Sequence, residues 1–271
     1  MREIREALID AHRAVGKTNP VAPSITNFVT VEFVANAQLA IGGSAAMVYL
    51  PDEGEAMCRL AKSIYINVGT LIPSHKETVP RTVKCARENA AYVLDPVAAG
   101  MGDLRTELLQ YMKAYPPRII RGNASEILTV AKLWGLIDGT SGKVRGVDAT
   151  ESVETARAAA EHLAAYIGGA VAVSGKEDLV TDGKRTVVSK GGSAYFTRIT
   201  GSGCSLGGVA AVYLAVADPF VAALAATNAY NVAGKRAEAQ ARGTASFQVE
   251  FLDALSNLTA EDIAACEMEE V

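Results

Sequence analysis

The chain alternates between short runs of apolar residues and longer segments in which apolar residues recur at helical spacing. Apolar runs without interior polar positions are typical of strands buried on both faces, and the longer segments are typical of amphipathic helices. This alternation predicts an α/β fold, with a mostly parallel central sheet between two helical layers. The candidate strands are Ala45–Leu50, Ser63–Val68, Tyr92–Val97, Arg118–Arg121 and Ala170–Ser174, and the candidate helices include Asp103–Lys113, Ser125–Trp134 and Ser152–Ile167.

The second half of the chain adds two different patterns. Leu179–Thr181 and Arg185–Ser189, joined through Asp182-Gly183, predict an antiparallel hairpin at the edge of the sheet. After Gly203 the pattern becomes helical almost to the end, and Leu206–Ala217 predicts a buried helix too short to cross a bilayer. Since no linker, repeat or low-complexity tract interrupts residues 1–271, we expect a single domain.

Composition excludes several classes of protein. The 271 residues contain 26 Lys and Arg against 30 Asp and Glu, and a net charge of −4 argues against nucleic acid as the main partner. Four scattered cysteines and three histidines exclude a disulfide scaffold or a zinc framework. The charged N-terminus does not resemble a signal peptide, so we expect a cytoplasmic protein with no membrane partner.

Polar residues and glycines follow most of the predicted strands. In an open α/β sheet, ligands bind at the carboxyl ends of the strands, so these turns are the candidate site. The turns are Val68-Gly69-Thr70, Leu94-Asp95-Pro96, Ile120-Arg121-Gly122-Asn123, Ser174-Gly175 and Thr200-Gly201-Ser202-Gly203-Cys204.

The last of these turns, residues 200–204, is the sharpest feature of the sequence. Two glycines before an apolar helix allow backbone N–H groups to converge on an anion such as a transferring phosphoryl group. Cys204 would lie in the first turn of that helix, where the dipole favours a lowered thiol pKa. The alternative is a glycine turn before a helix with a buried, inert cysteine. Neither the dinucleotide fingerprint nor the Walker loop matches the glycine spacing.

Four polar residues near the predicted strand ends are candidates for a chemical or a capping role. Asn123 and Glu126 could orient phosphates and hold Mg²⁺, but their spacing also fits a capping box at a helix start. Asp95 follows an apolar strand and is well placed for a cation. Asp148 is expected to be the N-cap of the next helix rather than a catalytic residue.

A set of short motifs over nearly the whole chain resembles one known family. They are Ser24-Ile25-Thr26-Asn27, Ala35-Asn36, Asn67-Val68-Gly69-Thr70-Leu71, Leu94-Asp95-Pro96-Val97, Arg121-Gly122-Asn123-Ala124-Ser125-Glu126, Gly146-Val147-Asp148-Ala149, Ser174-Gly175, Thr200-Gly201-Ser202-Gly203-Cys204 and Ser246-Phe247-Gln248-Val249-Glu250. On these residues the chain resembles the hydroxyethylthiazole kinases, which belong to the ribokinase-like superfamily. The glycine loop ending in cysteine is the most specific motif, because related kinases usually carry aspartate there.

The resemblance implies a fold, a reaction and a set of roles. The fold would be ribokinase-like, and the reaction would be phosphorylation of the hydroxyethyl group of hydroxyethylthiazole by ATP with Mg²⁺, in thiamine salvage. A homotrimer with active sites between subunits is also implied. By position, Cys204 would be the catalytic base, Met47, Gly201 and Asn27 would contact the thiazole, Arg121, Ser174 and Asn123 would contact ATP, and Glu126 and Asp95 would hold Mg²⁺.

The chain also departs from the family pattern beside the expected thiazole pocket, at Pro23, Phe28 and Glu32. Two alternative functions therefore accompany the resemblance. One is another ribokinase-like kinase of small alcohols, for example of hydroxymethylpyrimidine. The other is a thiazole-binding protein that has lost catalysis, although the presence of Asp95, Glu126 and Cys204 argues against it.

Overall fold

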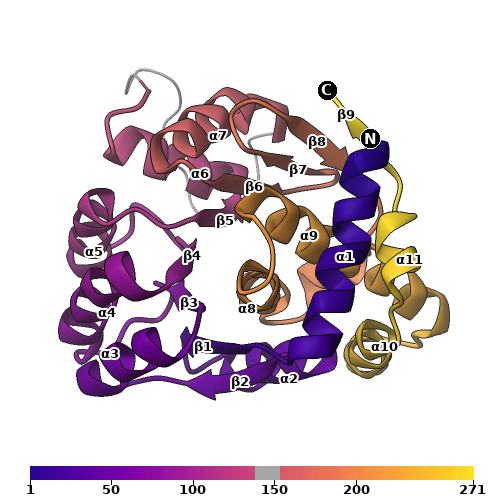
Figure 1. Cartoon of the computed structure of the whole chain (residues 1–271), viewed down its shortest axis with the longest axis horizontal. Helices are drawn as coiled ribbons and strands as arrows, with labels where there is room; N and C mark the ends of the chain where they lie inside the picture. The colour runs from indigo at the N-terminus through magenta and orange to yellow at the C-terminus, as the bar shows by residue number, and fades with distance from the viewer. Residues whose placement is uncertain (138–152) are drawn as a thin grey trace.

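A nine-stranded sheet runs through the computed structural model, which describes residues 1–137 and 153–271 (Figure 1). The strand order is β2-β1-β3-β4-β5-β6-β7-β8-β9, with the first six strands parallel and the last three joined by antiparallel pairing. The strands are β1 (Val21–Ile25), β2 (Ser44–Met47), β3 (Ser63–Asn67), β4 (Ala91–Asp95), β5 (Ile119–Asn123), β6 (Ala170–Ser174), β7 (Asp178–Thr181), β8 (Thr186–Ser189) and β9 (Met268–Glu270).

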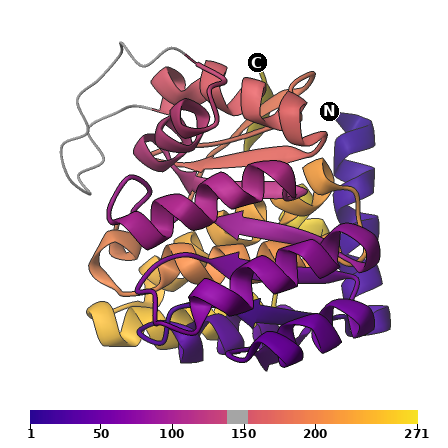
Figure 2. The same ribbon diagram turned by 90° about the vertical axis from the view of Figure 1, so that its left-hand side faces the viewer.

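Helices cover both faces of this sheet, and each layer has its own apolar core. Helices α1, α2 and α8–α11 pack on one face, and α3–α7 pack on the other, which faces the viewer in Figure 2. The helices are α1 (Arg2–Thr18), α2 (Val31–Ala40), α3 (Pro51–Leu60), α4 (His75–Asn89), α5 (Asp103–Ala114), α6 (Ala124–Leu133), α7 (Val153–Ile167), α8 (Ser202–Leu214), α9 (Pro219–Gln240), α10 (Thr244–Ser256) and α11 (Ala260–Ala264), with a short 3-10 helix η1 (Ala194–Arg198) before α8. The predicted three-layer α/β/α fold is confirmed.

The predicted elements differ from the observed ones in two places. Strand β1 was not predicted, because Pro23 and Ser24 interrupt its apolar run and proline is rare inside a sheet. The hairpin of β7 and β8 is confirmed, but its predicted place at the sheet edge is wrong. The C-terminal strand β9 pairs with β8 and forms the edge instead. Among the described residues, no helix is long and apolar enough to cross a membrane.

Alternation along the central strands decides which side chains face α8. In β3, Ile64 and Ile66 belong to the core beneath α3–α7, whereas Tyr65 belongs to the core beneath α8. Successive side chains of a strand point to opposite faces, so Asn67 faces the same way as Tyr65. In the next two strands, Val93 and Ile119 also belong to the α8 core, and Asp95 and Arg121 follow them by two residues. The carboxyl ends of three strands therefore present polar side chains to the start of α8.

Candidate active site

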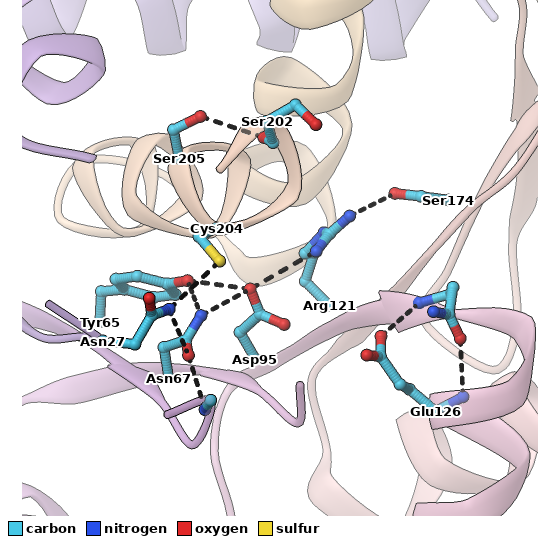
Figure 3. Close-up of polar contacts among 12 residues, drawn as sticks. Asn27, Tyr65, Asn67, Asp95, Arg121, Glu126, Ser174, Ser202, Cys204 and Ser205 are labelled. Carbon is cyan, nitrogen blue, oxygen red and sulfur yellow. Dashed lines mark hydrogen bonds and ion pairs between the residues drawn. The ribbon is translucent and has the colours of Figure 1, made fainter. Parts of the chain in front are cut away.

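Polar side chains from five parallel strands meet beneath the N-terminus of α8 (Figure 3). Most come from the carboxyl end of a strand or from the turn that follows, as the sequence predicts, whereas Tyr65 and Arg121 lie in the middle of their strands. Cys204 comes from α8 itself. The structure connects them by hydrogen bonds and one ion pair into a single cluster. Its members are Asn27, Tyr65, Asn67, Asp95, Arg121, Ser174 and Cys204.

The start of α8 is built for close approach to an anion. Gly201 is its N-cap, with a φ of 92° that favours glycine. Gly203 lies against the Arg121 guanidinium, since a Cβ there would be 2.7 Å from Nη1 of Arg121. The first N–H groups of a helix have no partner within it, so the N-terminus of α8 and the cation beside it favour negative charge. This geometry is the one that the glycine pattern predicts for an anion site.

Asp95 and Arg121 form a buried ion pair at the centre of the cluster. Nη1 of Arg121 lies 3.4 Å from Oδ2 of Asp95, and the Asp95 side chain is fully buried. Burial raises the pKa of Asp95 to about 7, although the neighbouring Arg121 cation opposes the shift. The other carboxylate oxygen, Oδ1, has no hydrogen-bond partner among the described residues. An unpartnered buried oxygen of this kind is a ready ligand for a cation.

Cys204 lies in the first turn of α8, and its Sγ accepts a hydrogen bond from Nδ2 of Asn27 at 3.5 Å. The predicted lowering of its pKa is wrong: burial raises the pKa of the thiol, and the nearby Asp95 charge raises it further. The hydrogen bonds with Thr30 and Asn27 and the Arg121 charge lower the pKa, but they do not overcome these two effects. Cys204 is therefore protonated at neutral pH in the protein without ligands.

Asn123 and Glu126 form the capping box that the sequence allowed. Oδ1 of Asn123 accepts from the Glu126 N–H, and Oε2 of Glu126 accepts from the Asn123 N–H, both at 2.9 Å. Oε1 of Glu126 accepts from the Ala98 N–H, so both carboxylate oxygens are held by backbone. The Glu126 charge also raises the pKa of Asp95, which places the two carboxylates within electrostatic reach of each other.

These two carboxylates fit Mg²⁺. No cluster of three or more His, Cys, Asp or Glu suited to a metal occurs in the described part of the chain. Mg²⁺ needs no such cage, since it is typically bound by one or two carboxylates together with substrate phosphates and water. The free Oδ1 of Asp95 and the remaining lone pairs of Glu126 supply that kind of ligand.

The other predicted residues are placed as follows. Nη2 of Arg121 donates to Oγ of Ser174 at 3.0 Å, so these two candidate ATP contacts touch. Gly201 packs against the start of α2, where a Cβ would lie 3.1 Å from atoms of Thr30. Met47 ends the edge strand β2, beside Ser24 of β1, and packs against the α8 core. Asp148 lies outside the described residues.

Tyr65 is the member of the cluster that the sequence analysis missed. An aromatic residue in an apolar strand is typical of core packing, so nothing distinguished it. One signal lay in the alternation of the strand: Asn67, two residues later, is polar and shares the face of Tyr65. In the structure Asn67 is paired in register with Asp95. Tyr65 therefore had to lie next to a polar cluster.

Comparison with known proteins agrees with the geometry. The model of the hydroxyethylthiazole kinase family matches residues 13–261. A hydroxyethylthiazole kinase of Bifidobacterium adolescentis is 50% identical over 277 residues, which cover 98% of this chain and 94% of the relative. One from Brachyspira hyodysenteriae is 36% identical over 97% of this chain and 98% of the relative.

Solved structures give the same result. The hydroxyethylthiazole kinase protein of Pyrococcus horikoshii superposes with a TM-score of 0.88 at 29% identity, covering 98% of this chain and 99% of that one. A pyridoxal kinase of Staphylococcus aureus, solved with ADP, superposes with a TM-score of 0.61 at 16% identity over 93% of this chain and 98% of that one, and so shares the fold. With the family model, the relatives and the site in agreement, the chain belongs to the hydroxyethylthiazole kinase family.

Proposed function

We propose that the protein transfers the γ-phosphoryl group of ATP to the hydroxyethyl group of hydroxyethylthiazole, as a step of thiamine salvage. The observation that carries the proposal is the convergence of Asp95, Arg121 and Cys204 beneath the N-terminus of α8. The Arg121 guanidinium, the free carboxylate oxygen of Asp95 and the thiol of Cys204, which is the proposed proton acceptor, lie close together there. Membership of the family supplies the identity of the alcohol.

The chain would act mainly by positioning and by stabilising charge, as phosphoryl transfer requires. The N–H groups of residues 201–204 would donate to the equatorial oxygens of the transferring group. Arg121, which contacts Ser174, would neutralise charge on the nucleotide phosphates, and Asn123 would orient them. The thiazole would lie beside Gly201, Asn27 and Met47, with its hydroxyl next to Cys204.

Asp95 and Glu126 would hold Mg²⁺ with the ATP phosphates. When bound, the ion would neutralise charge that develops on the phosphates. Asp95 must be ionised for this role, and its pKa of about 7 makes the carboxylate sensitive to the positive charge that enters the site. Arg121 already favours the ionised form and prepares the site for a cation.

Cys204 would accept the hydroxyl proton on Sγ as the phosphoryl group arrives. Because its pKa is raised, only a minor fraction of the enzyme carries the thiolate at neutral pH. Most molecules therefore carry the thiol, and only a few carry the thiolate that can act as the base. A loose transition state tolerates this, since the oxygen–hydrogen bond breaks late.

ATP consumption against a panel of small primary alcohols tests the proposed activity. We expect turnover with hydroxyethylthiazole and little with hydroxymethylpyrimidine or pyridoxal at equal concentration. Preference for hydroxymethylpyrimidine would assign the other kinase activity. Tight hydroxyethylthiazole binding without turnover would show a binding protein instead.

Substitution of Cys204 tests the base. We expect Cys204→Ala to lower kcat by about 10²–10⁴-fold, the usual contribution of a positioned base, with a smaller effect on KM. Cys204→Asp should retain much of the activity, because a carboxyl group is far more acidic than a thiol in the same surroundings and is ionised in a larger fraction of molecules. Cys204→Ser should behave like the alanine variant, because a hydroxyl is too weakly acidic to serve. Wild-type activity in the serine variant and none in the aspartate variant would contradict the role.

The same residue predicts a pH dependence. Since burial raises the pKa of Cys204 above its ordinary value, the thiolate fraction grows as pH rises through the neutral and mildly alkaline range. Asp95 has a pKa of about 7 and ionises over the neutral range in both proteins, so the difference is expected above it. Wild-type kcat should continue to increase in the mildly alkaline range, and that of Cys204→Asp should not. Steady-state rates of both proteins at constant ionic strength measure this difference.

Glu126→Gln separates the metal role from the capping role. An amide has one acceptor oxygen, so either the Asn123 or the Ala98 N–H loses its partner, and we expect a stability loss of about 1 kcal/mol. Turnover should fall by much more, and the concentration of Mg²⁺ needed for activity should rise. Asp262→Asn is the control, because it weakens the capping box of α11 and the ion pair of Asp262 with Arg236, and neither belongs to the site cluster. Stability loss with an unchanged rate in Glu126→Gln would leave Glu126 as a cap only.

We also propose that the chain acts as a single cytoplasmic domain that assembles as a homotrimer, on the basis of the family resemblance. A cavity of about 440 Å³ lies between α2, η1 and α10, and the apolar side chain of Val29 at its edge and that of the adjacent Phe28 are more than half exposed. Exposed apolar surface of this kind is typical of a subunit contact. We expect light scattering to give a mass three times that of the chain. A fully active monomer would contradict the assembly.

A further inference from the structure

Tyr65 is a buried phenol whose partners all belong to the active site. Its side chain is fully buried, and its hydroxyl donates to Oδ2 of Asp95 at 2.9 Å. The same hydroxyl accepts from Nδ2 of Asn67 at 2.7 Å. A buried tyrosine normally satisfies its hydroxyl with one convenient partner. Here the hydroxyl oxygen accepts from the Asn67 amide, and the only hydroxyl proton is donated to the Asp95 carboxylate (Figure 3).

The space for this ring is provided by a glycine in the middle of α8. A Cβ at Gly207 would lie 2.4 Å from Cε2 of Tyr65 and 3.0 Å from its hydroxyl oxygen. Glycine inside a helix is less favourable than alanine, so a residue with a side chain would be expected here on helix propensity alone. Gly207 is explained by the ring of Tyr65, and the two positions form a matched pair.

As a consequence, the two carboxylate oxygens of Asp95 have different surroundings. Oδ2 of Asp95 accepts from Tyr65, Asn67 and Arg121, the latter two at 3.2 and 3.4 Å. Oδ1 has no partner among the described residues. In Figure 3 this second oxygen points to the side of the site on which Glu126 lies. The donors fix the plane of the carboxylate and leave one oxygen available.

We propose that Tyr65, accommodated by Gly207, is a positioning residue of the phosphoryl-transfer site, which holds Oδ2 of Asp95 so that Oδ1 is presented to the cation bound with the nucleotide. This inference rests on the proposed function in assigning a cation to Asp95. Carboxylates that ligate metals are themselves oriented by hydrogen bonds, and loss of such a bond typically lowers metal affinity or activity by about 10–100-fold. Tyr65 does not touch the alcohol or the phosphates in this scheme.

Tyr65→Phe tests the inference, because it removes the hydroxyl and keeps the ring against Gly207. The probe is Mn²⁺ with ADP, and its dissociation constant is measured by electron paramagnetic resonance without turnover. We expect this constant to rise about 10–100-fold. We expect kcat to fall by a similar factor, with KM for hydroxyethylthiazole nearly unchanged. Circular dichroism and melting verify that the variant is folded.

Tyr92→Phe is the matched control. Tyr92 is also buried, lies on the adjacent strand β4, and donates its hydroxyl to the backbone carbonyl of Tyr115, away from the cluster. Its variant should lose stability and keep the wild-type affinity for Mn²⁺ with ADP. Equal Mn²⁺ affinity in wild type, Tyr65→Phe and Tyr92→Phe would overturn the inference.

A second pair of variants tests the fit between the ring and the glycine. Gly207→Ala should displace the ring and weaken Mn²⁺ binding much as Tyr65→Phe does. In a Tyr65→Val background the ring is absent, so Gly207→Ala should cause no further loss. Additive losses would overturn the pairing of the two positions.

The experiments distinguish failure of the proposed kinase activity from failure of the role of Tyr65. If the wild type phosphorylates no alcohol but Tyr65→Phe still weakens Mn²⁺ binding, the proposed function fails and the role of Tyr65 stands. If hydroxyethylthiazole is phosphorylated and Tyr65→Phe binds Mn²⁺ as the wild type does, the function stands and the role of Tyr65 is wrong.

Discussion

The buried ion pair between Arg121 and Asp95 is the constraint on which the rest of the site depends. Removing two charges from water is costly, and a buried pair is tolerated only when further hydrogen bonds satisfy it. Here Asn67 and Tyr65 donate to the carboxylate, and Ser174 accepts from the guanidinium. The pair also requires glycine at position 203, because a Cβ there would lie 2.7 Å from Nη1 of Arg121. The glycine loop is thus shaped by the cation beneath it as well as by the anion that it is expected to bind.

The sheet explains why such a pair can exist at this point. The carboxyl ends of parallel strands lie at the same edge of the sheet. Because side chains alternate along a strand, every second side chain points toward the helical layer that contains α8. Most of those side chains are apolar and bury against α8, whereas the last one on each of three strands is polar. The site is therefore the edge of a hydrophobic core, where burial is deep enough to shift pKa values and a helix N-terminus is still within reach.

Much of this could be predicted from the sequence, and the exceptions have physical reasons. The strands β3, β4 and β6 and the helix α8 were predicted from their apolar runs, and β5 was predicted from Ile119 and Ile120 alone. Strand β1 was hidden by Pro23, and β9 is only three residues long. The strand-end rule located Asp95, Arg121 and Ser174, but it could not show that Cys204 is partly buried. Since desolvation depends on packing from distant segments, the direction of its pKa shift could not be read from its place on the helix.

The hydrogen-bond network makes Cys204 and Asp95 parts of one unit. Asn27 donates to Cys204, and its amide also contacts Oδ1 of Asn67 at 3.3 Å. Asn67 in turn donates to Tyr65 and Asp95. The proposed base and the proposed cation ligand are therefore separated by two amides that are themselves fixed, one of them through the Gly69 N–H. Phosphoryl transfer depends more on such fixed geometry than on a strong base, because its transition state carries charge on the phosphoryl oxygens and little on the attacking alcohol. The minor thiolate fraction of Cys204, held in place by Asn27, is compatible with that chemistry, because the surrounding network fixes where the proton is accepted.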